Sequence, residues 1–412
     1  MQNSLNTALQ VDDLAPARSS LRIAMVSETY PPEVNGVANT VACLVEGLRT
    51  RNHAVQLIRP RQDRDDQGAQ SDRLQDVLTR GLPIPGYGHL RMGLPSKRAL
   101  LRLWTARRPD LVHIATEGPL GWSALQAALK LKLPVCSDFR TNFHAYSQFY
   151  RIGWLQKPIT AYLRKFHNRC HCTMVPTESL REQLDKAGFG PLAVVARGVD
   201  TALFSPHKRS ASLRAQWGVG ESDLVVLHVG RLAAEKNLPV LVKAFARIQS
   251  HQPNARLLVV GDGPSRQELQ AQCPGAIFAG FRHGEELAAH YASSDMFIFP
   301  SLTETYGNVT PEAMASGLAV LAFDDAAAAE LIDHQHNGML APKGDAAAFF
   351  QLAVELASHP RQRLAMGSQA RLVALDLGWE SIVRKMEGVD TQAMQQAESP
   401  LLEPGWDRLQ RS

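Results

Sequence analysis

The chain has 412 residues, of which 45% are hydrophobic and 20% are charged, as in ordinary globular proteins. This length exceeds what one hydrophobic core serves and predicts two domains of about 150–200 residues each, with a cleft between them. The formal net charge of +4 is too small and too dispersed to indicate a nucleic-acid partner.

No apolar run reaches the roughly 18–20 residues that span a bilayer, and residues 1–20 lack the basic start and apolar core of a signal peptide. We therefore expect a cytoplasmic protein that is at most peripheral on the inner face of the cell membrane. The five cysteines are scattered, which indicates reduced thiols. Cys170-His171-Cys172 does not predict a metal site, because its spacing is short and no second cluster accompanies it.

Short β-rich apolar runs alternate with helical patterns, which is typical of a parallel sheet covered by helices. In the first half, the predicted strands are residues 21–27, 54–60, 111–116, 134–139, 172–177 and 192–197. The rhythm then restarts with predicted strands at residues 224–230, 256–261, 276–281, 296–301, 318–323 and 338–341. The sequence thus predicts an α/β protein with two Rossmann-like, doubly wound domains that face each other across a cleft.

Turn residues separate the two runs of strands. Residues 197–200 and 203–206 contain Gly, Asp and Pro without a continuing period, which places the hinge at about 198–215. The polar ends of the chain predict loose termini, although the C-terminal tail can also pack back on the first domain. The predicted division is a flexible segment at 1–19, a first Rossmann-like domain at 20–200, a second Rossmann-like domain at 201–388 and a tail at 389–412.

Loops that follow strands are the candidate binding sites, because ligands of open parallel sheets bind beyond the carboxyl ends of the strands. After the first strand, Gly36 precedes an amphipathic helix that ends near Arg49. Such a glycine lets backbone N–H groups and the positive helix end approach a phosphate closely. Gly36 is therefore a candidate phosphate contact, while an ordinary loop glycine fits the same pattern.

Two cations follow the first strand of the second half, at Arg231 and Lys236. Their loop enters a helix, and together they can straddle a diphosphate with charge-assisted bonds worth about 1.5–3 kcal/mol each. Two solvated surface charges are the commoner outcome for an arbitrary Arg and Lys. The pair alone leaves both interpretations open.

Two glutamates follow the predicted strand at 296–301. Glu312 lies in the first turn of a helix, just after Pro311, where an acid complements the helix dipole without any substrate. Glu304 lies in the preceding loop and has no such structural role. Glu304 is therefore the better candidate for a carboxylate that faces a substrate.

A polar loop with aromatic residues follows the predicted strand at 134–139. It contains Arg140 and His144, which face the cleft from the opposite side if this loop binds a ligand. A surface arginine and a structural histidine explain the same residues equally well.

These motifs resemble the retaining glycosyltransferases of family 4, which have the two-domain GT-B fold. The resemblance rests on Val229-Gly230-Arg231 with Lys236, and on Glu304 and Glu312 within Pro-Ser-x-x-Glu-x-Tyr-Gly-Asn-x-x-x-Glu-Ala-Met-Ala-Ser-Gly at 300–317. It covers most of the chain through residues 31–36, 197–204 and 261–264. Within the family, the chain is most similar to bacterial GDP-mannose-dependent α-mannosyltransferases and related lipid glycosyltransferases.

The resemblance implies a set of donor contacts that agrees with the residues chosen above. These are Gly36, Arg231 and Lys236 for the diphosphate, Glu312 for the ribose, Glu304 with the backbone of Asn308 and Val309 for the sugar, and Phe281-Arg282-His283 for the base. Many relatives carry a histidine where this chain has Arg140, and the next histidine here is His144. Whether either residue contacts the sugar or the acceptor is left open.

Arg231, Lys236 and a helix end can neutralise a diphosphate leaving group, which is the task of a metal ion in other glycosyltransferases. We therefore expect no metal ion and no other cofactor. Asp63-Arg64-Asp65 matches the metal-binding pattern of that other class but lies in a charged loop, and we interpret it as solvated. The resemblance implies retention of configuration, with Glu304 as an orienting and charge-stabilising group rather than a nucleophile.

The acceptor is expected to be a lipid or a glycan. Residues 146–169 interleave aromatic and basic side chains, which suits shallow contact with an anionic membrane. A partly buried helix with snorkelling basic side chains fits this pattern as well.

Other function classes fit the sequence less well. A nicotinamide-dependent dehydrogenase needs Gly-x-Gly-x-x-Gly after a first strand, which neither Gly36 nor residues 261–264 supply. A sugar-nucleotide epimerase has no need of the paired glutamates, and a catalytically silent sugar-nucleotide sensor is the non-enzyme alternative. By resemblance alone, GDP-mannose is the expected donor, and UDP-glucose or another UDP-sugar in a glycolipid glycosyltransferase is the alternative.

Overall fold

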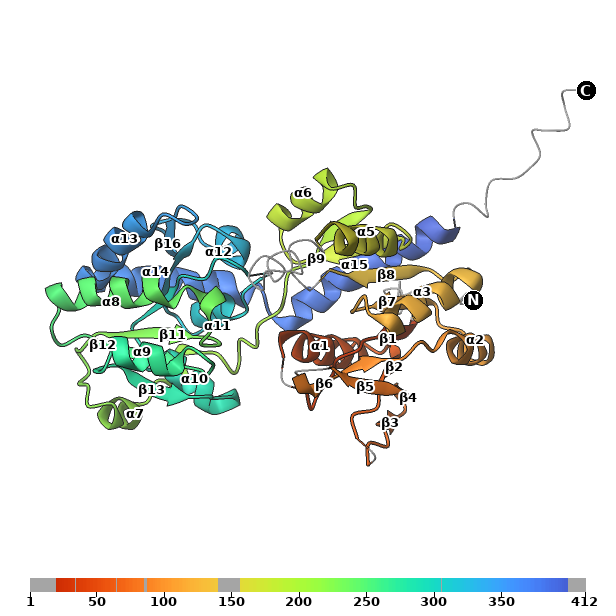
Figure 1. Cartoon of the computed structure of the whole chain (residues 1–412), viewed down its shortest axis with the longest axis horizontal. Coiled ribbons are helices and arrows are strands. Elements are labelled where there is room, and N and C mark those ends of the chain that lie inside the picture. Colours follow the sequence, from red (N-terminus) through yellow and green to blue (C-terminus); the bar gives the residue numbers. More distant parts are fainter. Residues whose placement is uncertain are drawn as a thin grey trace, which may run out of the picture.

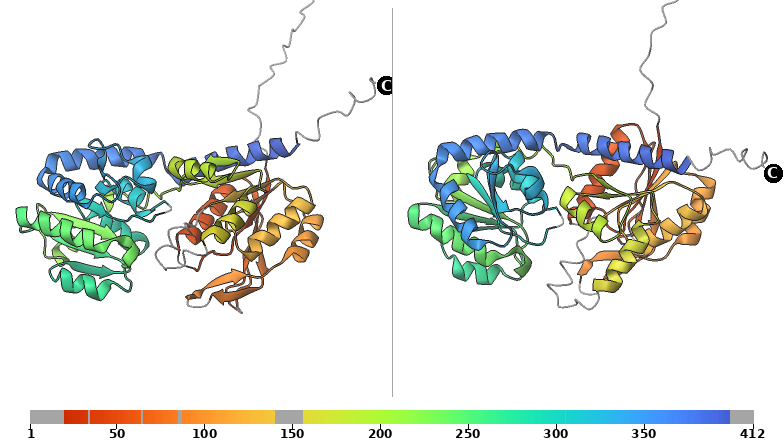
Figure 2. Two further views of the ribbon diagram at one scale, coloured as in Figure 1. Left: turned by 45° about the horizontal axis from the view of Figure 1, so that its top comes forward. Right: turned by 90° about the horizontal axis from the view of Figure 1, so that it is seen from above.

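The computed structural model describes residues 20–33, 35–63, 65–84, 87–139, 156–304 and 306–398. They form two α/β domains that lie side by side along the long axis of the molecule (Figure 1). In each domain, helices cover both faces of a mainly parallel sheet (Figure 2). This arrangement confirms the predicted fold class.

The first domain contains an eight-stranded sheet in the order β10-β9-β8-β7-β1-β2-β4-β3. Neighbouring strands pair in parallel, except for the antiparallel pair β3 and β4. The strands are β1 (Arg22–Val26), β2 (Ala54–Pro60), β3 (Gln70–Ser71), β4 (Leu74–Thr79), β7 (Leu111–Ile114), β8 (Val135–Asp138), β9 (Cys172–Val175) and β10 (Leu192–Val194). The strand order changes direction at β1 and β7, where open α/β sheets bind ligands.

The second domain contains a six-stranded parallel sheet in the order β13-β12-β11-β14-β15-β16. The strands are β11 (Val225–Val229), β12 (Arg256–Val260), β13 (Ile277–Gly280), β14 (Met296–Phe299), β15 (Ala319–Phe323) and β16 (Gly338–Ala341). Here the order changes direction at β11 and β14, which gives this domain its own ligand-binding edge.

Helices connect the strands. In the first domain they are α1 (Gly36–Thr50), α2 (Lys97–Ala106), α3 (Pro119–Lys130), α5 (Gln156–His167) and α6 (Glu178–Lys186). The second domain has the short helices η2 (Pro206–Lys208), α7 (Ala211–Gln216), η3 (Ala234–Lys236), α9 (Arg266–Gln272), α11 (Val309–Ala315) and α12 (Ala326–Leu331), with α8 (Leu238–His251), α10 (Gly284–Ala292), α13 (Ala346–Ser358) and α14 (Pro360–Leu375). The last described element is α15 (Trp379–Glu398).

Continuous apolar runs form the central strands because both faces of each sheet are buried. All five residues of β11 are buried. Val226 packs into the core on one face of the sheet with Leu241 of α8, and Leu227 packs on the other face with Met314 of α11. Helix starts follow local rules as well, since Asp345 caps α13 by accepting from the Ala348 N–H at 3.0 Å.

The connection between the two domains contacts the second domain and the chain that returns from it. Val199 N donates to the Leu377 carbonyl at 3.0 Å, so the outgoing and returning connections run side by side. From Thr201 onward the linker is fastened to the second domain, because Arg371 of α14 donates to the carbonyl oxygens of Thr201 and Phe204 at 2.9 and 2.7 Å. Residues 201–204 therefore pack on the second domain.

The last helix, α15, returns from the second domain to the first (Figures 1 and 2). Its buried residues Ile382, Val383 and Met386 share a core cluster with α1 and β1. Gly47 of α1 permits this approach, because a Cβ there would lie 2.5 Å from Val383 Cγ2. Helix α15 therefore packs on the first domain through an apolar face that precedes its Gln-rich segment.

All twelve predicted strands overlap observed ones, whereas β3, β4 and the hairpin of β5 (Gly81–Ile84) and β6 (Tyr87–Gly93) were not predicted. The segments at 1–19 and 399–412 lie outside the described residues. Within the described ranges, no helix is both long enough and apolar enough to cross a bilayer.

Candidate functional site

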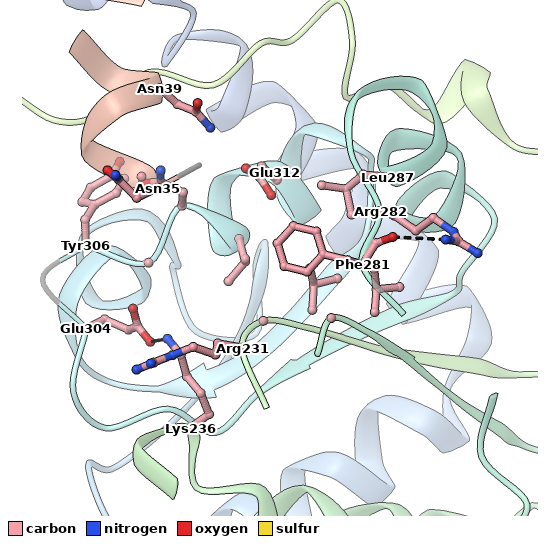
Figure 3. A pocket seen from close by; sticks show the side chains of 18 of the residues that line it. Asn35, Asn39, Arg231, Lys236, Phe281, Arg282, Leu287, Glu304, Tyr306 and Glu312 are labelled. Carbon is pink, nitrogen blue, oxygen red and sulfur yellow. Dashed lines mark hydrogen bonds and ion pairs between the residues drawn. The ribbon is translucent and has the colours of Figure 1, made fainter. Parts of the chain in front are cut away.

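A cavity of about 730 Å³ lies between the two domains, at the edge where β1 and β11 end. Its first-domain wall is the loop before α1 with the first turn of that helix, and the loops after the second-domain strands form the opposite wall (Figure 3). The lining includes the predicted residues Gly36, Arg231, Lys236, Arg282, Glu304, Asn308, Val309 and Glu312. Residues from both halves of the chain therefore meet in one pocket.

The tip of α1 faces this cavity. Asn35 caps the helix, and its Oδ1 accepts from the backbone N–H groups of Val37 and Ala38 at 3.1 and 2.8 Å. A Cβ on Gly36 would lie 3.6 Å from Asn308 Nδ2 across the domain gap. The tip is therefore close to the second domain, and because Asn35 already accepts from Val37 and Ala38, the Gly36 N–H and the positive helix dipole are the features that suit an anion.

The two predicted cations lie together, and each is paired with a carboxylate. Lys236 Nζ contacts Glu304 Oε1, and Arg231 contacts Glu235. Figure 3 shows Arg231 and Lys236 at the end of the pocket where Glu304 lies. The Lys236 side chain is only 17% exposed, so it is not a solvated surface charge.

The Glu304 carboxylate is held from two sides. Ser301 Oγ donates to Glu304 Oε1 at 2.6 Å, and Lys236 contacts the same oxygen. Lys236 Nζ also lies 5.6 Å from the centre of the Phe299 ring. The carboxylate therefore has a fixed position at the carboxyl end of β14, as the sequence predicted.

Glycines let the loops after β11 and β12 stack beneath the cations. Gly261 has a φ of +136°, and a Cβ there would lie 2.0 Å from the Gly230 carbonyl oxygen. A Cβ on Gly263 would lie 2.4 Å from the Leu232 carbonyl oxygen. The loop that carries Arg231 therefore rests directly on the loop after β12.

Glu312 lies on the cavity wall and has a perturbed pKa. Tyr291 Oη donates to Glu312 Oε2 at 2.9 Å. Burial raises the pKa of Glu312 to about 7, and the bond from Tyr291 only partly offsets this effect. Since one face of the side chain opens to the cavity, Glu312 can accept hydrogen bonds from a ligand once it is ionised.

His228 of β11 lies just behind the loop with Arg231 and is fully buried. Its Nδ1 lies 3.1 Å from the Ile298 carbonyl oxygen, which can only accept, so Nδ1 carries the proton. Burial lowers the pKa of His228 to about 4, with a smaller contribution from Lys236. The imidazole is therefore neutral at pH 7 and adds no charge beneath the pocket.

Asn308 and Arg282 line the pocket in different ways. Asn308 Oδ1 lies 3.4 Å from Arg197 NH1, so the second domain contacts the linker here. The Arg282 guanidinium instead folds back to the Phe281 carbonyl at 3.1 Å and approaches Glu286 at 3.7 Å. Phe281 itself is 55% exposed and lines the cavity together with Arg282.

The sequence analysis also interpreted a polar loop, an acidic loop and a pair of cysteines. Arg140 and His144 lie outside the described residues. Asp63 is exposed and accepts from the backbone N–H groups of Asp65 and Asp66, as expected of a solvated loop. The sulfur atoms at Cys170 and Cys172 are free thiols, and burial raises their pKa values to about 12 and 11.

Sequence reasoning did not select Asn35, Arg197, His228 or Tyr291. Asn35 had a usable signal, because an asparagine directly before a helix start predicts a cap. Arg197 lines the pocket, whereas Tyr291 bonds to the lining residue Glu312 and His228 lies behind the Arg231 loop, through contacts made across strands or domains. Those contacts have no local pattern in the sequence.

Two Rossmann-like domains that share one interdomain pocket, with cations after the first strand of the second domain, define a glycosyltransferase of the GT-B class. Residues 34–203 match the family model described as Glycosyltransferase Family 4, and residues 223–359 match the one described as Glycosyl transferases group 1. The chain belongs to glycosyltransferase family 4, as the sequence motifs indicated.

Individual relatives agree with this assignment. The chain is 34% identical to a GDP-mannose-dependent alpha-mannosyltransferase of Mycobacterium tuberculosis, over 89% of this chain and 96% of the relative. It is 28% identical to an alpha-monoglucosyldiacylglycerol synthase of Streptococcus pneumoniae, over 78% of this chain and 75% of the relative. The crystal structure of Anabaena HepE with UDP and glucose has the same fold, with a TM-score of 0.69, 20% identity and coverage of 90% of this chain and 100% of that one.

Proposed function

We propose that this glycosyltransferase moves mannose from GDP-mannose to a lipid or glycan acceptor, with retention of configuration and without a metal ion. The observation that carries the proposal is the single cavity in which the α1 tip, the Arg231 and Lys236 cations and the Glu304 carboxylate meet. The name of the Mycobacterium tuberculosis relative supports the choice of donor.

Each group has a task in this reaction. Arg231, Lys236 and the backbone N–H of Gly36 bind the diphosphate and stabilise the charge that develops on it. Glu312 accepts hydrogen bonds from the ribose hydroxyls. Glu304 turns toward the donor sugar, orients it and stabilises the positive charge at its reacting carbon.

The transfer exchanges one bond at the sugar carbon for another. The bond from C1 to the diphosphate oxygen breaks, and a bond from C1 to the acceptor oxygen forms on the same face. The acceptor proton passes to a phosphate oxygen of the departing GDP. Because the cations and the helix tip neutralise the leaving group, no divalent ion is required.

A UDP-sugar-dependent glycolipid glycosyltransferase is the second candidate. The alpha-monoglucosyldiacylglycerol synthase of Streptococcus pneumoniae supports it, because its name specifies a glucosylated diacylglycerol product. The candidates differ in the base and sugar of the donor but share the diphosphate site. A thermal-shift panel of GDP-, UDP- and ADP-sugars separates them, since a ligand at 100 times its dissociation constant adds about 2.7 kcal/mol to stability.

The principal test is Glu304→Ala in a transfer assay with the donor that the panel selects. The variant is expected to lose transfer while it still binds GDP, because Glu304 acts on the sugar and not on the nucleotide. Glu355→Ala, at a half-buried glutamate of α13 that does not line the cavity, is the control. Unchanged transfer by Glu304→Ala contradicts the proposed role, and absence of transfer by the wild type with every donor and acceptor tested supports a sensor instead.

Two further measurements address the mechanism. Transfer is expected to continue at an undiminished rate in EDTA, and a rate restored only by added divalent ions would contradict metal independence. The anomeric configuration of the product, measured by NMR coupling across C1, is expected to match that of the donor. An inverted product would rule out the retaining mechanism.

Contact with an anionic membrane belongs to the same proposal. Helix α5 exposes Lys157, Tyr162, Arg164 and Lys165, and its buried face includes Phe166. We expect the protein to sediment with phosphatidylglycerol vesicles at low salt but not with phosphatidylcholine vesicles. The double variant Lys157→Glu/Lys165→Glu is expected to sediment less with these vesicles, whereas Lys243→Glu in the second domain serves as the control. Equal sedimentation of the double variant and the control contradicts membrane contact through α5.

A further inference from the structure

A chain of side-chain hydrogen bonds holds the tip of α1 from behind. Asn35 Oδ1 accepts from Val37 N and Ala38 N, as described above, so its amide nitrogen must point away from the helix. That nitrogen donates to Thr29 Oγ1 at 2.6 Å. Because the Thr29 hydroxyl accepts this bond, its own proton is available for a second partner, and it donates to Glu33 Oε2.

Glu33 anchors the other end of this chain. Its side chain is buried, and Oε1 accepts from Gln62 Nε2 at 3.0 Å and from Arg91 N at 3.3 Å. A carboxylate can accept all three bonds, from Thr29, Gln62 and Arg91, because it presents only acceptors. A glutamine at this position would turn an N–H group toward one of the three donors.

We propose that Thr29 and Glu33 are positioning residues for the diphosphate site. They fix the rotamer of Asn35, and Asn35 fixes the first turn of α1, where Gly36 lines the cavity. This inference rests on the proposed binding of a diphosphate at the α1 tip. The chain of bonds lies wholly in the first domain, so its loss leaves Arg231, Lys236 and Glu304 in place.

Thr29→Val is the decisive variant, and Thr29→Ser is its matched partner. Valine keeps the shape of threonine but leaves the Asn35 amide and the Glu33 carboxylate without their bonds, whereas serine keeps the hydroxyl. We expect Thr29→Val to weaken GDP binding and lower kcat/KM for the donor about 10- to 100-fold, as for a misplaced binding group. Thr29→Ser is expected to restore most of both.

Guanosine distinguishes positioning from a general structural defect, because it fills the base and ribose sites without a diphosphate. Its affinity is expected to be the same in the wild type and in Thr29→Val, as measured by calorimetry. Equal weakening of guanosine and GDP overturns the proposal. Equal GDP affinities of the valine and serine variants overturn it as well.

Glu33→Gln provides a second route if Thr29→Val does not fold. It is expected to weaken GDP binding and spare guanosine binding, whereas Glu46→Gln, at an exposed carboxylate of α1, is expected to change neither. An unaltered GDP affinity in Glu33→Gln contradicts the proposal. If the wild type binds UDP in place of GDP, the same comparison is made with UDP and uridine, so the positioning role can be tested even when the expected donor base is wrong. A wild type that binds no nucleoside diphosphate refutes both the proposed function and this positioning role.

Discussion

Lys236 and Glu304 form an ion pair at the edge of the interdomain pocket, although 68 positions separate them in the sequence. Each side chain is 17% exposed, so water screens the pair only partly. Removal of one partner therefore leaves the other charge poorly compensated. In the proposed reaction, contacts to the bound donor replace this ion pair, because the diphosphate pairs with Lys236 and the sugar hydroxyls donate to Glu304.

Lys236→Met tests the cationic half of this arrangement. The variant keeps the length and apolar stem of the side chain but removes its charge. We expect GDP affinity to fall by about 1.5–3 kcal/mol, the range of a charge-assisted hydrogen bond. Isothermal titration calorimetry measures this change, with Lys243→Met on the outer surface of α8 as the control. A Lys236→Met variant with wild-type GDP affinity would show that Lys236 serves only to hold Glu304.

Glu312 predicts a pH dependence of nucleoside binding. Burial raises its pKa to about 7, so it is largely protonated at pH 6 and largely ionised at pH 8. Because the ionised carboxylate accepts ribose hydroxyls, guanosine affinity is expected to rise about tenfold between pH 6 and pH 8. The nucleoside is used because it has no phosphate that titrates in this range. Glu312→Gln is expected to give a flat profile, and the same rise in that variant would exclude Glu312 as its source.

Substitution by alanine is expected to lower the stability of the protein at Gly261 but not at Gly275. A Cβ at Gly261 would lie 2.0 Å from the Gly230 carbonyl oxygen, and its φ is +136°. Gly261→Ala is expected to destabilise the protein by at least about 1–3 kcal/mol from backbone strain and to displace the loop with Arg231. At Gly275 a Cβ meets nothing within 4 Å, so Gly275→Ala is expected to stay within about 0.5 kcal/mol of the wild type. Urea denaturation measures both, and equal midpoints for the two variants contradict the predicted clash.

The central strands could be predicted because burial on both faces demands uninterrupted apolar residues. Strand β4, next to the short edge strand β3, is different, because the only buried residue among its six is the charged Asp76. The hairpin of β5 and β6 contains Gly81 and Pro83, which are typical of loops. These strands form through pairing with β2 and with each other, and such long-range pairing leaves little local trace.

The residues of the site could likewise be predicted from local motifs, whereas their side-chain partners could not. Motif spacing indicated Arg231, Lys236 and Glu304, and the structure places all three in one pocket. The pairing of Arg231 with Glu235, and the bonds from Thr29 to Glu33 and Asn35, depend on side-chain directions within folded loops. Sequence patterns indicate which residues lie at a strand end but not which partner each one meets there.

A buried charge cluster joins α15 to the first sheet and predicts a pH-dependent stability. His113 Nε2 lies 3.0 Å from Asp138 Oδ2, and His113 Nδ1 lies 3.6 Å from Asp390 Oδ1 of α15. Burial alone would lower the pKa of His113, but the two carboxylates outweigh it and raise this pKa to about 10. Arg51 and His53 face α15 farther along, where both contact Glu387, and the thiol of Cys136 lies near Asp390.

His113→Gln tests this cluster through the pH dependence of unfolding. Since the folded pKa of His113 exceeds its unfolded value of about 6.5, its stabilising contribution is complete below pH 6.5 and is lost as the pH rises through about 10. The variant leaves two buried carboxylates without a cation and is expected to lose about 3–5 kcal/mol at pH 6.5. Urea denaturation at pH 6.5 and pH 9.5 should show a smaller difference from the wild type at the higher pH, because the wild type has by then lost part of the same stabilisation. His251→Gln, at an exposed histidine of α8, controls for the loss of an imidazole. If the stability difference between His113→Gln and the wild type does not change with pH, the cluster contributes through packing and not through charge.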